Sequence, residues 1–98
     1  MAKEIIWSNL AKMELGNVLD FYVQQNGNAN YSLKLLDEID DILKTLSQSE
    51  LIGRLSKNKV TRVFPHDVYL IFYEVSNNRI EIISFWDNRQ NEIRRKVK

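Results

Sequence analysis

The chain has 98 residues, of which 44% are hydrophobic, 10% aromatic and 28% charged, and its formal net charge is +1. This length allows a single domain over residues 1–98, because a second core would need at least about 40 further residues. Three glycines and one proline exclude a disordered tail or a linker array. The chain has no cysteine and one histidine, His66, so it has no disulfide framework or cysteine nucleophile, and we expect neither a metal nor a cofactor.

The two halves of the chain carry opposite charge. Residues 1–50 hold eight acidic and four basic side chains, whereas residues 51–98 hold ten basic and five acidic ones. Such a division indicates an anionic partner for the basic half, either a nucleic acid or an acidic protein segment.

The longest apolar run has six residues, 68–73, and a bilayer crossing takes about 20. Nothing at the start of the chain resembles a secretory signal. We therefore expect a cytoplasmic protein with no membrane partner.

The first half predicts a strand followed by a helical hairpin. Residues 3–7 contain the β-favouring run Ile5-Ile6-Trp7, and Ser8 is a candidate helix cap. Apolar side chains then recur at helical spacing up to a stop at 26–28: Ala11, Leu15, Val18, Leu19 and Tyr22. A second stripe lies in residues 31–47: Leu35, Ile39, Ile42, Leu43 and Leu46. Their short connection predicts two antiparallel helices.

The second half predicts a long loop and three strands. Residues 48–58 lack periodicity and contain Gly53, which is typical of a mobile loop. Strand patterns follow at 59–64, 68–75 and 79–86, with turns at 65–67 and 76–78, and the polar residues 87–98 predict a short helix or a frayed end. The fold class is therefore α+β: an antiparallel meander, joined by the N-terminal strand, packs against the two-helix hairpin in the order βααβββ.

This order of elements resembles the RelE/ParE superfamily over residues 5–91. The resemblance is carried by Ile6-Trp7-Ser8, Ala11, Tyr31-Ser32, Leu35, Gly53, Val60-Thr61-Arg62, the run from Tyr69 to Val75 and the run from Phe85 to Asn91. It implies the toxin of a type II toxin-antitoxin module, held inactive by an antitoxin encoded beside it. RelE-like members cut messenger RNA in the ribosomal A site, whereas ParE-like members inhibit DNA gyrase without an established hydrolytic site.

The resemblance also implies site residues. RNA cleavage through the 2'-hydroxyl needs a base, an acid and a cation over the phosphorane, and RelE-like enzymes use mainly Lys and Arg on the sheet. The catalytic candidates here are Arg62, Lys59 and Arg89, with Arg62 as the phosphate clamp and Lys59 as base or acid. The expected surface for an anionic partner comprises Lys57, Lys59, Arg62, Trp86 and Arg89.

Two departures favour the gyrase-type toxin. Leu70 follows Tyr69 where RelE-like sequences commonly place an arginine, and no tyrosine or histidine follows Arg89 to act as an acid. We therefore expect a non-hydrolytic growth inhibitor whose partners are an antitoxin and DNA gyrase. A RelE-like endonuclease acting on ribosome-bound mRNA and a non-toxic binding domain of the same fold remain alternatives, so whether the chain is an enzyme stays open.

Several candidates also have a structural interpretation. Arg62 could face solvent or pair with Glu74 or Glu81, and Lys57 and Lys59 could belong to a solvated loop. We interpret His66 as a turn residue, Tyr69 and Tyr73 as core, and the acidic run in residues 37–41 as an exposed helix face rather than a metal site. Trp86 either closes the core or stacks on a partner.

Overall fold

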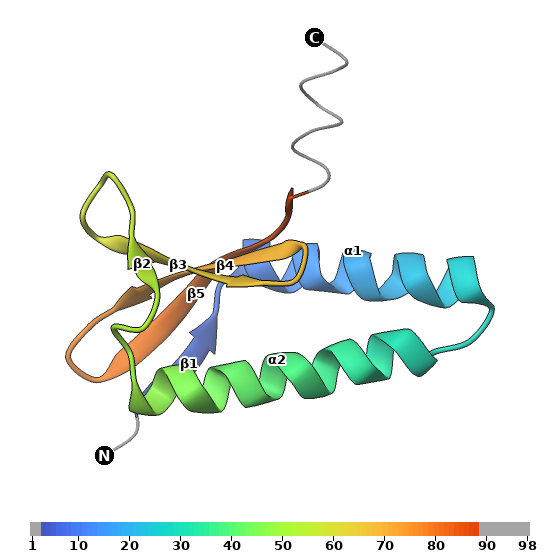
Figure 1. Ribbon diagram of the computed structural model, residues 1–98, viewed down its shortest axis with the longest axis horizontal. Coiled ribbons are helices and arrows are strands. Elements are labelled where there is room, and N and C mark those ends of the chain that lie inside the picture. The colour runs from blue at the N-terminus through green and yellow to red at the C-terminus, as the bar shows by residue number, and fades with distance from the viewer. Residues whose placement is uncertain (1–2, 89–98) are drawn as a thin grey trace, which may run out of the picture.

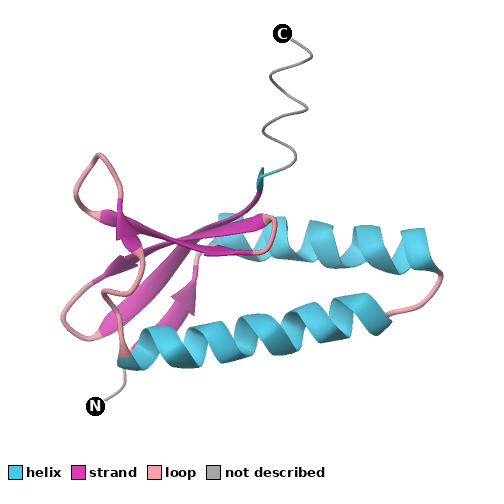
Figure 2. Cartoon of the chain, viewed as in Figure 1, coloured by secondary structure: helices cyan, strands magenta, loops and turns pink. Residues whose placement is uncertain are grey.

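The structure is a computed structural model that describes residues 3–88. Its elements run in the order β1 (Glu4–Trp7), α1 (Asn9–Asn26), α2 (Asn30–Gln48), β2 (Arg54–Leu55), β3 (Thr61–His66), β4 (Tyr69–Val75) and β5 (Arg79–Asp87) (Figure 1). The strands form one sheet in the order β1-β5-β4-β3-β2, with β1 parallel to β5 and all other neighbours antiparallel. Figure 2 shows the helical hairpin extending beyond the sheet, with the connecting loop at its far end.

Local signals set the bounds of the helices. The Ser8 hydroxyl accepts a hydrogen bond from the Ala11 N–H at 3.0 Å and caps α1, which ends at Gly27 in the left-handed region with φ 73°. Helix α2 is strongly amphipathic and buries the side chains of Leu35, Ile39, Ile42 and Leu46. Helix α1 fully buries only Ala11 among its residues and leaves Met13 and Phe21 exposed.

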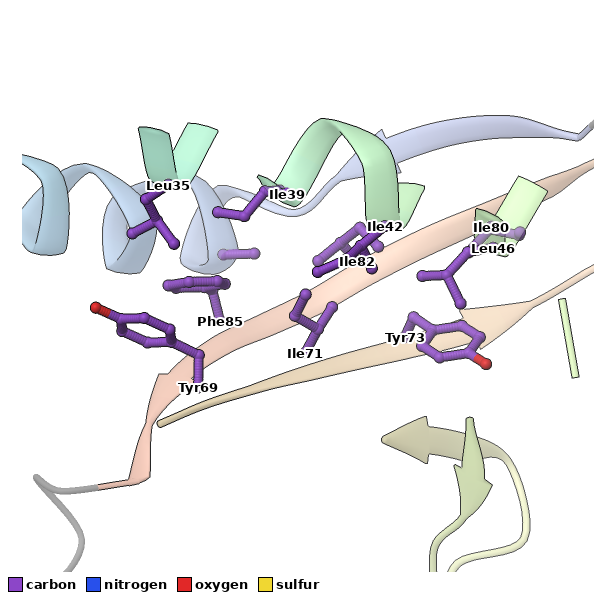
Figure 3. Packing of buried hydrophobic residues seen from close by; sticks show 11 residues of the cluster. Leu35, Ile39, Ile42, Leu46, Tyr69, Ile71, Tyr73, Ile80, Ile82 and Phe85 are labelled. Atoms are coloured by element: carbon purple, nitrogen blue, oxygen red, sulfur yellow. The ribbon is translucent and has the colours of Figure 1, made fainter. Parts of the chain in front are cut away.

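The core lies between the helices and one face of the sheet. Figure 3 shows the apolar side chains of α2 facing Tyr69, Ile71 and Tyr73 of β4. An irregularity between Phe72 and Tyr73 shifts the β4–β5 register, so that Ile82 and Phe85, three residues apart, both reach this core. All these side chains are buried, which follows from alternation along β4 and from the register shift in β5.

Helix α1 closes one edge of the sheet where β1 ends. The Ser8 N–H donates to the Ile82 carbonyl at 2.9 Å, and its hydroxyl donates to the Ile83 carbonyl at 2.8 Å. Farther along β5, Oε1 of Glu14 accepts hydrogen bonds from the Ser84 hydroxyl at 2.7 Å and the Phe85 N–H at 3.0 Å. The side chains of Ser8, which caps α1, and Glu14 thus bond to backbone groups of β5 beyond the point where β1 ends.

The predicted α+β class, the helical hairpin and the joining of the N-terminal strand to the meander are confirmed. The sheet was expected to be antiparallel, but it is mixed, because β1 pairs with β5 in parallel. The expectation that Tyr69 and Tyr73 belong to the core is confirmed as well. The prediction for residues 87–98 falls largely on residues 89–98, which lie outside the described part of the chain.

Two local predictions were wrong. Residues 48–58 contain the short strand β2, which was expected to be loop. The predicted turn at 65–67 is displaced because β3 continues through Pro65 to His66, and Asp67 takes the left-handed conformation with φ 55°. Proline is tolerated there because β2 pairs only with Arg62 and Val63, which leaves β3 an edge strand at Pro65.

Neither helix in the described chain has the length and apolarity that a bilayer crossing requires.

Candidate interaction surface

Tyr73 and Arg62 hold the segment that joins α2 to β2. The buried Tyr73 hydroxyl accepts a hydrogen bond from the Gly53 N–H at 2.8 Å and donates one to the Glu50 carbonyl at 2.9 Å. Nη1 of Arg62 donates to the Gly53 carbonyl at 2.8 Å and more weakly to the Leu51 carbonyl at 3.3 Å. The side chains of two neighbouring strands therefore fix the path of residues 50–53.

Gly53 is required in this segment by space rather than by a special φ angle. A Cβ atom there would lie 2.6 Å from the Tyr73 hydroxyl oxygen and 2.7 Å from the ring carbon Cε1. Burial raises the pKa of Tyr73, and the Gly53 N–H and the Arg62 charge only partly oppose that rise. The hydroxyl consequently stays protonated at neutral pH, and it can donate to Glu50 while it accepts from Gly53.

Asn58 organises the tip of the β2–β3 hairpin. Its Oδ1 accepts hydrogen bonds from the Ser56 hydroxyl and from the N–H groups of Val60 and Thr61, each at 2.8 Å. Its Nδ2 donates to Oγ1 of Thr61, which in turn donates to Glu74 on β4. The tip includes Lys59 with φ 62°, an uncommon conformation for a residue with a side chain. The network connects this strained tip to the centre of the sheet.

Residues 51–60 carry exposed aliphatic and cationic side chains together, and we call them the 51–60 surface. The aliphatic members expose between 43% and 62% of their surface: Leu51, Ile52, Leu55 and Val60. The cationic members are Arg54, Lys57 and Lys59, which are also exposed, and the ten residues contain no acidic side chain. Figure 1 shows β2 and the hairpin loop at the end of the sheet away from the helix-connecting loop.

The residues expected to bind an anionic partner are distributed over different places. Lys57 and Lys59 lie on the hairpin tip. Arg62 lies on β3 opposite Tyr73 of β4, and its side chain donates a hydrogen bond to the α2–β2 segment. Trp86 pairs with Leu70 and lies on the sheet face opposite the core, where it lines a shallow hollow of about 440 Å³. Arg89 lies outside the described residues. Their roles as site residues remain predictions.

The hollow beside Trp86 is mainly apolar. Its other lining residues are Thr61, Leu70, Phe72, Ile83, Ser84 and Asn88. None of these described residues is a cation or a strong general base, so the hollow offers no charge to a phosphate. Arg62, the predicted phosphate clamp, uses its Nη1 on two backbone carbonyls.

His66 differs from its predicted role as a turn residue. It is part of β3, and its Nε2 lies 2.9 Å from a carboxylate oxygen of Glu38 on α2. The histidine thus links strand to helix. The acidic run on α2 forms no metal-ligating group with other described residues, and Asp40 pairs with Lys44 one turn later.

The sequence matches the family model described as the ParE toxin of the type II toxin-antitoxin system parDE, over residues 5–92. The chain belongs to the ParE toxin family. It is therefore a toxin-type member of the RelE/ParE superfamily, which confirms the resemblance drawn from the sequence.

One solved structure similar to this ParE-family chain is described as the chromosomal ParDE TA system from P. aeruginosa. The two chains are 23% identical and superpose with a TM-score of 0.70, covering 86% of this chain and 94% of the other. At this identity the likeness shows a shared fold. A comparison with curated protein sequences gave no match.

Sequence reasoning missed the roles of Tyr73 and Asn58. Tyr73 was predicted as a core residue, which is correct for its ring, but its hydroxyl forms hydrogen bonds with the α2–β2 segment. Asn58 was interpreted only as part of a loop. The available signal was the Asn58–Thr61 spacing next to a strand, since asparagine commonly accepts hydrogen bonds from N–H groups two and three residues later.

Proposed function

We propose that this chain is a cytoplasmic toxin that arrests growth by binding DNA gyrase, without a hydrolytic step. The observation that carries the proposal is the position of Arg62. Nη1 of its guanidinium donates to the carbonyls of Gly53 and Leu51 and so orders the chain, which gives the side chain a structural role and leaves Nε and Nη2 for a phosphate. Membership of the ParE toxin family supports the same conclusion.

The chemistry within reach of Arg62 also favours binding over RNA cleavage. Tyr73, the titratable group closest to it in the hydrogen-bond network, has a raised pKa because it is buried, and its hydroxyl is engaged with Gly53 and Glu50. It is poorly placed to take a proton from a 2'-hydroxyl. Lys57 and Lys59 remain available on the surface for electrostatic contact.

The experiment compares two targets directly. Purified chain is added to gyrase with relaxed plasmid and ATP, and separately to ribosomes programmed with a defined mRNA. We expect loss of supercoiling and intact mRNA. Cuts in the A site that disappear in an Arg62→Ala variant would instead establish the RelE-like endonuclease, with Arg79→Ala, an exposed arginine on β5, as the matched control.

Unopposed expression in a bacterial host distinguishes the remaining alternative. A toxin arrests growth, whereas a non-toxic binding domain that keeps the fold leaves growth unchanged. The same culture yields plasmid for topology analysis, which should show relaxed DNA if gyrase is the target.

We also propose a cognate antitoxin as the inhibitory partner of this chain. Its association should weaken with salt, because the cations of the second half of the chain would meet acidic groups. Simultaneous charge reversal at Lys59, Arg62 and Arg89 should weaken binding, and unchanged affinity would contradict this. Because Arg62 also orders residues 51–53, a Lys59→Glu/Arg89→Glu variant separates the effect of charge from that of loop order.

A further inference from the structure

The 51–60 surface lies at an open edge of the sheet. Within residues 3–88, strand β2 is the last strand in the sheet order and pairs only with β3. The Ser56 N–H donates to the Thr61 carbonyl at 2.8 Å, so Ser56 and Thr61 form a hydrogen-bonded pair. In an antiparallel ladder such pairs alternate, and the N–H and carbonyl of Leu55 therefore point away from β3. Leu55 offers one donor and one acceptor to an added strand.

The side chains around this edge specify the chemistry of a partner. Four exposed aliphatic groups and three cations occur within ten residues that carry no acidic side chain. Nucleic acids are held mainly by cations together with aromatic stacking platforms, and the 51–60 surface contains no aromatic residue. Aliphatic and cationic groups together are complementary to an extended protein segment that alternates aliphatic and acidic residues.

The edge is also ordered before any partner binds. Tyr73 and Arg62 fix residues 50–53 on one side of β2, and the Asn58 network fixes the hairpin on the other. A surface of this kind loses less conformational entropy on binding than a mobile loop would. An ordered strand edge that stays unpaired favours unwanted pairing with other strands, which is a disadvantage of leaving it exposed.

We propose that a partner protein adds an acidic, aliphatic segment as a sixth strand along β2, with its carboxylates on Arg54, Lys57 and Lys59. The strand-addition proposal deepens the proposed function. It rests on that function in one respect, namely that the chain acts through protein partners. It assigns Arg62 and Asn58 as positioning residues of the docking surface, which contact the partner little or not at all.

The test uses a fluorescein-labelled ten-residue peptide of alternating Glu and Val as the probe. Fluorescence anisotropy should show binding that weakens as salt is raised. The variant Arg54→Glu/Lys57→Glu/Lys59→Glu should bind at least about tenfold more weakly. The matched control, Lys12→Glu/Lys34→Glu/Arg79→Glu, has the same net charge and reverses exposed cations elsewhere, so it should retain most of the affinity.

Backbone pairing is tested separately from charge. Leu55→Pro removes the outward N–H at a position where an edge strand tolerates proline, and it should weaken peptide binding several-fold more than Leu55→Ala. A second peptide with proline at every other valine keeps its charge but cannot form a ladder, and it should bind weakly. Urea unfolding of each variant confirms that it is folded.

Three results would overturn the proposal. Equal affinity for the two peptides would exclude strand addition. Tighter binding of a ten-nucleotide RNA, lost in the same triple variant, would assign the surface to nucleic acid. Concentration-dependent self-association that Leu55→Glu abolishes would assign it to a second copy of the chain. Peptide binding by a chain that does not inhibit gyrase would support this proposal and reject the gyrase target, so the two failures are distinguishable.

Discussion

At one edge of the sheet, helix α1 packs beside β5, and the side chains of Ser8 and Glu14 bond to its backbone. At the other edge, Tyr73 and Arg62 reach past β2 and bond to the segment before it, so the outward groups of Leu55 have no such cover in the described chain. At both edges, polar side chains form hydrogen bonds with backbone groups. The bonds from Ser8 and Glu14 close the edge beside α1, whereas the bonds from Tyr73 and Arg62 order the edge at β2 and leave it open.

The contrast between the two edges shows that the presence of a cation on a strand is not by itself a sign of substrate binding. The Arg62 guanidinium has the charge and geometry of a phosphate clamp, but its acceptors are the carbonyls of Gly53 and Leu51. Near this edge, the exposed cations are Arg54 on β2 and Lys57 and Lys59 on the hairpin. Function at the open edge therefore depends on surface side chains supported by buried ones.

Gly53→Ala should be the most damaging single change at the open edge. The added methyl would lie 2.6 Å from the Tyr73 hydroxyl, whose ring is fixed in the core, and we expect a loss of about 3 kcal/mol in the free energy of unfolding. Gly16→Ala is the matched control. Its Cβ meets nothing within 4 Å, so in helix α1 it should stabilise by about 0.5–1 kcal/mol. Urea denaturation measures both, and equal effects would contradict the steric argument.

Tyr73→Phe keeps the ring and removes both hydrogen bonds of the hydroxyl. Leaving the Gly53 N–H and the Glu50 carbonyl without this partner should cost about 2 kcal/mol. Combined with Gly53→Ala the cost should be less than the sum, because the clash with the hydroxyl oxygen disappears. A double-mutant cycle by urea denaturation measures the coupling, and strict additivity would be inconsistent with the observed contact.

Alkaline pH should destabilise the chain through its buried tyrosines. Burial raises the pKa of Tyr73, and burial together with the hydroxyl of Tyr31 raises the pKa of Tyr69. Above about pH 10 an unfolded tyrosine loses its proton while the folded one retains it, so this stability is complete below pH 10 and falls as pH rises. Each tyrosine can contribute up to about 1.4 kcal/mol per pH unit. Urea denaturation between pH 8 and 11 should show a shallower decline in Tyr73→Phe than in the parent chain, and parallel declines would refute this cause.

Glu14→Ala should weaken the closed edge by about 1 kcal/mol, because the N–H of Phe85 loses its acceptor. Asp20→Ala, at an exposed position on the same helix, is the control and should change stability little. Thermal or urea unfolding compares the two variants. A larger loss from Asp20→Ala would show that helix charge, rather than edge closure, governs this region.

The long periodic elements could be predicted from the sequence, because their apolar residues recur at the helical or strand period over many positions. Strand β2 could not, since two residues are too few to show alternation and its pairing depends on the hairpin centred on Asn58. The strand through Pro65 was hidden by the usual association of proline with turns. Burial along β4 was predictable from alternation, but the partner of the Tyr73 hydroxyl was not.

The sequence predicted which exposed cations belong to the candidate site, but it did not predict the hydrogen bonds and backbone directions that arrange the site. Lys57 and Lys59 were expected to be accessible cations, and both are exposed on the hairpin. The acceptors of Arg62 are backbone carbonyls, which every residue carries, so no sequence pattern marks them. The same holds for the outward direction of the Leu55 backbone, which follows from strand register alone.

Amide hydrogen exchange followed by NMR tests the difference between the two edges most directly. In the unbound chain, the N–H of Phe85 should be protected by Glu14, while the outward N–H of Leu55 should exchange rapidly. Addition of the alternating Glu–Val peptide should protect Leu55 and leave Phe85 unchanged. Slow exchange at Leu55 without peptide, or new protection that avoids β2 when peptide binds, would contradict the account of an open, strand-accepting edge.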